Sequence, residues 1–190
     1  MSLRPASLPL ALVLLLSAVL GVTSSTAATL EQLSNERLID ESTEIVRGTV
    51  VYCNQIYRQP VIWTVCEINV SERFKGPTAA KIQIAIPGGT ASGLRQSFEG
   101  SPTLTRNGEY LFFLWQGKSG LKQIMGLSQG LLNIAKDEKG NLILTRAKAE
   151  DRMVDAAGNP IADPGVNIRL SDFKAKILSR TADKSSGARQ

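Results

Sequence analysis

The residues best suited to chemistry in this 190-residue chain are two cysteines, because the chain contains no histidine. Histidine is the commonest general base and the commonest metal ligand near neutral pH. Its absence excludes a Ser-His-Asp triad, a Cys-His pair and every zinc site that needs histidine. Redox-active cysteines typically form a Cys-X-X-Cys motif at the start of a helix, and Cys53 and Cys66 do not. We therefore predict a structural disulfide, with a reactive thiol pair as the alternative.

Three glutamates, Glu67, Glu72 and Glu109, could supply the pair of carboxylates that glycoside hydrolysis requires. Two of them have simpler roles in the expected β-sheet, where Glu72 lies opposite Arg47 and Glu67 lies on the outer face. We therefore predict a chain without catalytic residues that is not an enzyme. A hydrolase that uses carboxylates alone is the alternative.

Two further patterns resemble ligand sites but lack the residues that define them. The segment from Pro87 to Gly93 follows a strand, as a phosphate-binding loop would, but it has no Gly-Lys-Ser/Thr ending and no helix pattern after it. Asp155, Asn159 and Asp163 do not have the one-three-five spacing of a calcium-binding loop. Both patterns are typical of turns, so we predict no cofactor and no metal.

Both cysteines lie in a stretch, residues 44–76, that reads as two β-strands folded back on each other. Pairing Cys53 with Cys66 fixes the register of every other pair in the hairpin. This register places Arg47 opposite Glu72 as a structural ion pair and creates one largely apolar face. That face pairs Val51 with Ile68, Thr49 with Val70 and Ile45 with Phe74. Opposed residues in antiparallel strands have Cα atoms about 4.5–5.5 Å apart, a separation that a disulfide spans.

The first 28 residues have the three parts of a signal peptide. Arg4 supplies a positive charge, residues 8–22 form an apolar run, and residues 24–28 are small. A retained membrane anchor is the alternative, although the run is somewhat short for a span of about 20 residues. We expect export to the periplasm or the medium, with no membrane span after cleavage. The net charge of +5 is modest and spread along the chain, so we expect no nucleic-acid partner.

The remaining sequence predicts a helix near the start and a series of short strands. Residues 29–42 read as a surface helix capped by Thr29. Residues 109–115 are nearly continuously apolar, which predicts a central strand covered on both faces. The other predicted strands cover residues 81–86, 131–135 and 142–145, and the last two flank a turn.

A long loop and the C-terminal region differ in composition from these strands. Residues 90–107 are rich in Gly, Ser, Thr and Pro, and a long loop inside a compact domain is often functional. Its expected anchors are Leu94, Phe98 and Leu104. Residues 147–190 read as a turn-rich extension, with a short helix from Ser171 and a disordered end after Thr181.

Five short motifs follow one another along the chain: Gly48–Val50, Phe74–Gly76, Ile86–Gly89, Gly108–Tyr110 and Gly126–Gly130. Over roughly residues 30–135 the chain thereby resembles a family of uncharacterised exported bacterial proteins. Its first half is also distantly similar to the netrin-like domain of the tissue inhibitors of metalloproteinases. That similarity rests on Phe74–Pro77 and on Gly108–Leu111.

The resemblance implies a mainly β protein, with an OB-like (netrin-like) antiparallel Greek-key barrel over residues 29–146. It also implies an N-terminal helix and a short C-terminal helix. The residue pattern agrees, because it gives many short antiparallel strands and no alternation of strands with helices. Those inhibitors bind the zinc of their target through a cysteine at the mature N-terminus, and no cysteine precedes Cys53 here. Their inhibitory mechanism is therefore not expected to carry over.

We expect an exported, non-enzymatic module that binds another protein or a cell-surface polymer. An OB-like barrel would offer such a ligand a face of aromatic and basic side chains. The candidates for that face are Tyr52, Tyr57, Arg58, Trp63, Arg73, Lys75 and Lys81. Inhibition of a secreted protease through residues 90–107 is a further alternative.

Overall fold

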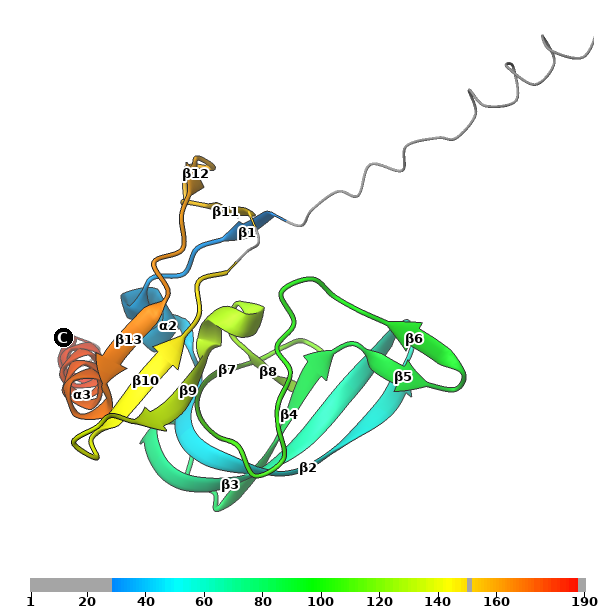
Figure 1. Ribbon diagram of the computed structural model, residues 1–190, viewed down its shortest axis with the longest axis horizontal. Helices are drawn as coiled ribbons and strands as arrows, with labels where there is room; N and C mark the ends of the chain where they lie inside the picture. The colour runs from blue at the N-terminus through cyan, green and yellow to red at the C-terminus, as the bar shows by residue number, and fades with distance from the viewer. Residues whose placement is uncertain (1–28, 150–151, 188–190) are drawn as a thin grey trace, which may run out of the picture.

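A long antiparallel hairpin forms the frame of the fold, as the sequence predicts (Figure 1). The computed structural model describes residues 29–149 and 152–187, and the hairpin consists of β2 (Glu44–Arg58) and β3 (Val61–Lys75). Each strand has 15 residues, about three times the usual strand length. The hairpin is therefore long enough to join the main sheet at one end and to project from it at the other.

The predicted register holds at the tip of the hairpin and slips toward its base. Cys53 lies opposite Cys66, but Val51 has no partner, because it forms a β-bulge. As a result Val50, not Val51, lies opposite Ile68. A one-residue slip changes which side chains face the core, and Val50 is fully buried whereas Val51 is half-buried. The other predicted apolar pairs shift as well, to Thr49 with Asn69 and Ile45 with Lys75.

The main sheet has eight strands and partly closes on itself. Besides β2 and β3 it contains β4 (Lys81–Pro87), β7 (Glu109–Gln116), β8 (Lys122–Ile124), β9 (Leu131–Lys136), β10 (Leu142–Arg146) and β13 (Val166–Arg169). Their order is β13-β10-β9-β7-β2-β3-β4-β8, and β7 also pairs with β8. The strands β2, β3, β4, β8 and β7 thus follow one another in a ring. All pairs in this ring are antiparallel except β4–β8, which is parallel and consists of one pair, Ala85 with Gln123.

Two hydrophobic clusters lie on the two sides of the sheet, and β7 contributes to both. Phe112 belongs to the cluster inside the ring and Phe113 to the outer cluster, and both side chains are fully buried. This confirms the prediction of a central strand covered on both faces. The helices α2 (Asn35–Glu41) and α3 (Leu170–Gly187) cover the outer cluster, to which they contribute Ile39, Phe173 and Ile177.

The described part of the chain begins with a strand, whereas the sequence predicted a helix. β1 (Thr29–Glu31) pairs in parallel with β11 (Arg152–Val154). The helix α2 follows only after Ser34, whose side chain accepts a hydrogen bond from the backbone N–H of Arg37. The predicted cap at Thr29 is therefore wrong, because a better-placed serine starts the helix one turn and a half later.

A buried glutamine fastens this first segment to the main sheet. Gln129 lies in a short 3₁₀ helix, η2 (Leu127–Gly130), and is 2% exposed. Its side-chain oxygen accepts a hydrogen bond from the N–H of Leu33 at 2.8 Å, and its NH₂ group donates to the carbonyl of Glu31 at 3.0 Å. The amide thus pairs with the backbone as a neighbouring strand would. The motif at residues 126–130 is structural.

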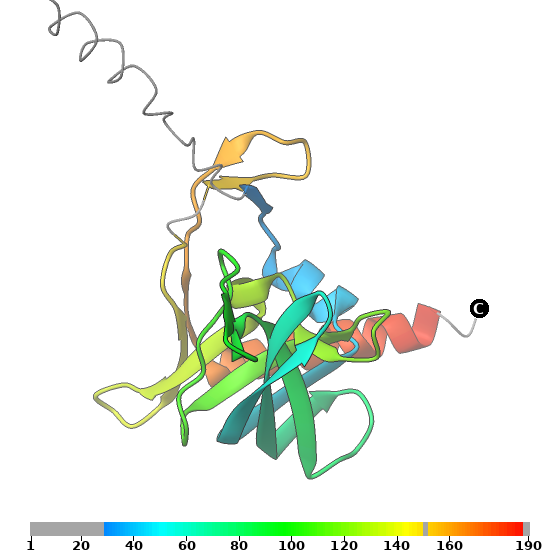
Figure 2. The ribbon, with the colours of Figure 1, turned by 90° about the vertical axis from the view of Figure 1, so that its right-hand side faces the viewer.

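The C-terminal region takes part in the fold far beyond the predicted domain boundary at residue 146. β11 and β12 (Pro160–Ile161) form a small three-stranded sheet with β1, which stands off the main sheet in Figures 1 and 2. β13 joins the main sheet beside β10, and Phe173 of α3 packs edge-on against Phe113. The helix continues to Gly187, so the prediction of a short helix with disorder after Thr181 is wrong up to that residue.

Part of the predicted loop over residues 90–107 folds as a hairpin. β5 (Gly89–Ala91) and β6 (Leu94–Gln96) pair with each other beside the tip of β2 and β3 (Figure 1). Leu104 packs against the inner cluster and is an anchor, as expected. Leu94 and Phe98 are 54% and 40% exposed, so the prediction that they anchor the loop is wrong.

The predicted signal peptide, residues 1–28, lies outside the described residues. Within residues 29–149 and 152–187, no helix is long and apolar enough to cross a membrane.

Candidate functional site

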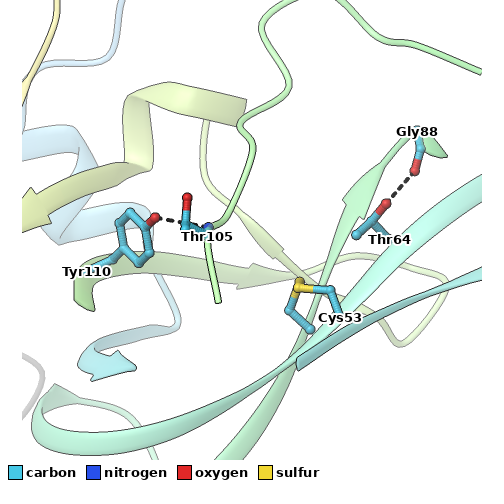
Figure 3. The surroundings of a disulfide bond; sticks show 6 residues. Cys53, Thr64, Gly88, Thr105 and Tyr110 are labelled. Atoms are coloured by element: carbon cyan, nitrogen blue, oxygen red, sulfur yellow. Dashed lines mark hydrogen bonds between the residues drawn. A yellow bond between two sulfur atoms is a disulfide. The ribbon is translucent and has the colours of Figure 1, made fainter. Parts of the chain in front are cut away.

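The predicted disulfide between Cys53 and Cys66 is present, with Cα atoms 4.1 Å apart (Figure 3). The two cysteines lie opposite each other in the hairpin, in the register that the sequence predicts. Cys66 is fully buried in the inner cluster, whereas Cys53 is exposed. At this bond β2 has already lost its neighbour β7, whereas β3 still pairs with β4 as far as Trp63. We call residues 52–65, which contain Cys53 and the tip of the hairpin, the arm.

The β5–β6 hairpin is fastened to the arm by the side chain of Gln96. Its amide oxygen accepts a hydrogen bond from the N–H of Ile62 at 2.7 Å, and its NH₂ group donates to the carbonyl of Pro60 at 3.0 Å. This is the same pattern that Gln129 makes with the first segment of the chain. A side-chain amide in each case replaces a strand neighbour.

The turn between β4 and β5 brings this hairpin over the arm. Gly88 and Gly89 have φ angles of 108° and 137°, which favour glycine. A Cβ atom on Gly89 would lie 2.9 Å from Cγ of Gln55, so a larger residue would push the hairpin off the arm. The hydroxyl of Thr64 donates to the carbonyl of Gly88 at 2.8 Å (Figure 3). The glycine-rich segment therefore forms the turn at Gly88, as predicted, but its residues Gly89–Ala91 are strand β5.

Hydrogen bonds also hold the second half of the loop in place. The hydroxyl of Ser101 donates to the carbonyl of Pro87 at 3.0 Å. The N–H of Thr105 donates to the hydroxyl oxygen of Tyr110 at 3.1 Å (Figure 3). The N–H of Asn107 donates to the carbonyl of Val50 at 2.9 Å. The loop is thus positioned by backbone and side-chain contacts along its whole length.

A groove of about 420 Å³ lies between the arm and this loop. The disulfide, Gln55 and Thr64 line one wall, and Phe98, Thr103 and Leu104 line the other. None of the described residues that line the groove carries a charge. Phe98 contributes an aromatic ring that is 40% exposed, and the amide and hydroxyl groups can make hydrogen bonds. These groups suit an uncharged ligand better than an ion, because there is no charge to attract one.

The predicted ion pair between Arg47 and Glu72 is replaced by two others. The residues lie opposite each other as predicted, but Nε of Arg47 donates to Glu109 at 2.8 Å, and Glu72 pairs with Lys174. The reason is that β7 lies beside β2 and α3 lies over β3, and each brings a closer partner. Glu67, the third candidate carboxylate, pairs with Lys81 at 2.9 Å. Each glutamate is therefore engaged by a different cation, and none lines the groove.

The predicted face of aromatic and basic residues is not assembled as one surface. Tyr57 is opposite Ile62 on the groove side of the arm, and strand alternation places Tyr52 and Trp63 on the other side. The two basic residues near the base of β3 hold the fold together. The Nη1 atom of Arg73 donates to Glu44 at 2.8 Å, and Nζ of Lys75 donates to the carbonyls of Ile39 and Asp40.

Glu44 is a buried carboxylate at the base of the hairpin, 4% exposed. Burial alone would raise its pKa, but hydrogen bonds from Lys122 and Arg73 outweigh burial and lower the pKa below the ordinary value. Glu44 thus stays charged as the centre of an ion-pair network. Its role is structural, because its partners Arg73 and Lys122 come from two other strands of the ring, β3 and β8.

The candidate calcium ligands are parts of turns, as predicted. Asp155 accepts hydrogen bonds from the N–H groups of Ala157 and Asn159. Asp163 is engaged by the guanidinium of Arg146 at 2.9 Å. Within residues 29–149 and 152–187, no group of three or more Cys, Asp or Glu side chains is placed to hold a metal ion.

Comparisons with known proteins give no relative from which a function could be transferred. No protein-family model, no curated protein and no solved structure matches the chain. We therefore infer function from the groove and from the residues that build it. Sequence reasoning pointed to the loop that forms one wall, but it did not identify Gln55 and Thr64 of the arm as the other wall. The only signal for them is their spacing of two and eleven residues from Cys53.

Proposed function

We propose that this protein is an exported, non-enzymatic module that binds an uncharged glycan of a cell surface in the groove between arm and loop. The observation that carries the proposal is the uncharged lining of the groove, with the exposed ring of Phe98 beside amide and hydroxyl groups. Sugar rings have apolar faces that pack on an aromatic ring and hydroxyl groups that hydrogen-bond to amides and hydroxyls. A cavity of about 420 Å³ is within the usual size range of a ligand site.

We further propose that the ring of β2, β3, β4, β8 and β7 is an OB-like Greek-key barrel. An OB fold is a five-stranded, partly open barrel that binds oligosaccharides or oligonucleotides. The ring of five strand pairings supports this assignment, and the single pair between β4 and β8 corresponds to the open seam. The netrin-like variant of the fold stays a proposal on the motif resemblance alone.

Export is supported by the sequence of the first 28 residues and by the disulfide. Arg4, the apolar run and the small residues after it form the pattern of a signal peptide. A disulfide forms and persists in oxidising compartments and is rare in the reducing cytosol. Both observations favour a protein that works in the periplasm or outside the cell.

The test is a binding titration of the purified protein against neutral, anionic and cationic oligosaccharides of matched length. We expect binding to a neutral glycan that changes little with salt, because no charge lines the groove. Phe98→Ala should weaken this binding about tenfold, the loss expected for one aromatic contact. Leu94→Ala is the matched control, since Leu94 is exposed on the same loop but does not line the groove.

Preference for a charged polymer, or binding that Phe98→Ala leaves unchanged, would reject this function. Equal weakening by Leu94→Ala and Phe98→Ala would place the ligand on the outer surface of the loop. That surface is the feature of a second candidate function, inhibition of a secreted protease. Leu94 lies next to the tip of the β5–β6 hairpin and is 54% exposed. It is two residues from Gln96, whose side chain fastens the hairpin to the arm. Inhibition that Leu94→Asp abolishes would favour this second function.

A further inference from the structure

Among the residues that the structure describes, no strand lies beside one edge of β2 along the arm. The pairing of β2 with β7 ends at Thr49, and the backbone of Asn107 and Gly108 then covers Val50 with two hydrogen bonds. Over residues 52–58, β3 is the only strand of the described chain that pairs with β2. All residues of this segment are exposed. We call it the free edge.

The hydrogen bonds of β3 show which backbone groups of the free edge point outward. Ile62 accepts a hydrogen bond from Gly88 and donates its own N–H to Gln96, both on the side away from β2. Along an antiparallel strand, successive residues direct their N–H and C=O groups alternately toward the strand on one side and toward the strand on the other side. The residues of β2 opposite Ile62, Thr64 and Cys66 therefore direct their N–H and C=O groups away from β3. These residues are Tyr57, Gln55 and Cys53.

Apart from Arg58 and the β-bulge at Val51 beside it, the free edge lacks the devices that usually stop strands from pairing edge to edge. Such edges normally carry Lys, Pro or a bulge, or lie under a helix or loop. The free edge reads Tyr-Cys-Asn-Gln-Ile-Tyr-Arg, which contains neither Lys, Pro, Gly nor an acidic residue. Tyr52, Ile56 and Tyr57 on it are 46%, 37% and 43% exposed. A flat edge with large exposed side chains is a surface that another strand would cover.

We propose that the free edge pairs with the same edge of a second copy of this chain, antiparallel and centred on Gln55. In that register Gln55 lies opposite Gln55, and Tyr52 lies opposite Arg58 of the second copy. The only charge of the segment thus meets an aromatic ring and not another cation, which favours the pair. Cys53 and Tyr57 lie opposite each other, so every outward N–H meets an outward carbonyl.

The pairing places two grooves side by side. Directly opposed residues of an antiparallel sheet project to the same face. Cys53 and Gln55 line the groove, so the two grooves of the dimer lie on one face, next to the shared edge. A polymer with repeated units could then bind both grooves at once, which raises its apparent affinity. This consequence rests on the proposed function, whereas the dimer itself does not.

The experiment measures the mass of the purified protein by analytical ultracentrifugation over a dilution series. We expect a dimer that dissociates on dilution. Gln55→Pro removes an outward N–H that β3 does not use, so the monomer should fold as before while the dimer is lost. Two unpaired backbone groups at the centre should raise the dissociation constant about a hundredfold. Gln55→Ala keeps the N–H and is the matched control, which should stay dimeric.

Amide hydrogen exchange locates the contact in the unchanged protein. The N–H of Tyr57 should exchange slowly at high concentration and rapidly after dilution, because only the second copy protects it. This measurement also decides the matter if Gln55→Pro does not fold. A protein that is monomeric at every concentration would overturn the proposal, and so would a dimer that folded Gln55→Pro leaves intact. A monomer that binds a neutral glycan would reject the dimer and keep the function.

Discussion

Asp163 is a carboxylate whose side chain is completely shielded from solvent, yet it stays charged. Burial alone would raise its pKa, but hydrogen bonds from Arg146 and from the N–H groups of Ala149 and Gly165 outweigh burial. Together they lower the pKa of Asp163 to about 2. Arg146 ends β10, so this single carboxylate connects the main sheet to the segment that leads into β13.

The low pKa of Asp163 predicts a loss of stability in acid. The folded-state pKa lies below the ordinary value of 3.8, so the contribution of Asp163 is complete above about pH 4 and is lost as the pH falls toward 2. The contribution is about 2 kcal/mol. Urea unfolding between pH 4 and pH 2 should show a steeper loss for the natural protein than for Asp163→Asn, which cannot titrate. Parallel pH profiles would contradict the assignment.

Arg47 and Glu72 show what a register can and cannot predict about single residues. The sequence predicts correctly that they lie opposite each other, because period-two alternation determines the register locally. It does not predict their partners, because Glu109 and Lys174 approach from β7 and α3, which lie far away in the sequence. The hydrogen bonds that the side chains of two glutamines make with distant backbone segments were missed for the same reason. Gln96 and Gln129 pair with backbone segments 34 and 96 residues distant.

At the scale of secondary-structure elements, α3 is held on the outer cluster by side chains of two kinds. Phe173 and Ile177 are fully buried against the sheet. Lys176 and Arg180 pair with Glu36 and Asp40 of α2. These ion pairs are partly exposed and contribute little, so the buried side chains supply most of the stability. The main role of α3 is therefore to cover the outer cluster with its buried side chains.

This division of roles predicts a sharp contrast between neighbouring positions of α3. Phe173→Ala should lower the free energy of unfolding by about 3–5 kcal/mol, because it leaves a cavity beside Phe113. Leu178→Ala should change it by less than about 0.5 kcal/mol, since Leu178 is 49% exposed. Urea unfolding of both variants provides the measurement. Similar losses for the two variants would show that α3 is packed differently.

The elements that follow a local pattern could be predicted, and those that depend on distant partners could not. The hairpin, the strand around Phe112 and the turn before β10 all follow from alternation and turn residues. The β-bulge at Val51 could not be predicted, because Val50 and Val51 are both apolar and either could face the core. The role of β13 was also missed, because a four-residue strand with two exposed positions has almost no pattern of its own.

Viewed as a whole, the molecule has its helices and its groove at opposite ends. Figure 1 shows α3 at one end of the long axis and the β5–β6 hairpin with the arm at the other. The strands β2 and β3 run between the two ends and belong to both. The disulfide lies at the groove end and cross-links β2 to β3 there, in addition to the packing of Cys66 in the inner cluster.

Removal of the disulfide should therefore affect the stability of the whole protein. The double variant Cys53→Ala/Cys66→Ala should lose about 3 kcal/mol of unfolding free energy, the chain-entropy value for a short loop. Urea unfolding without reductant measures the loss. The natural protein treated with reductant should match the double variant. A difference between the two would indicate that the alanines, and not the missing bond, cause the change.

The position of the disulfide also decides what a protease can do to the arm. The sulfur bridge joins the chain below the tip, so a cut anywhere over residues 54–65 leaves both ends covalently attached. Trypsin acting after the exposed Arg58 should give a protein of unchanged size on a non-reducing gel and two fragments on a reducing gel. A severed arm would thus remain on the molecule as a nicked but undivided chain.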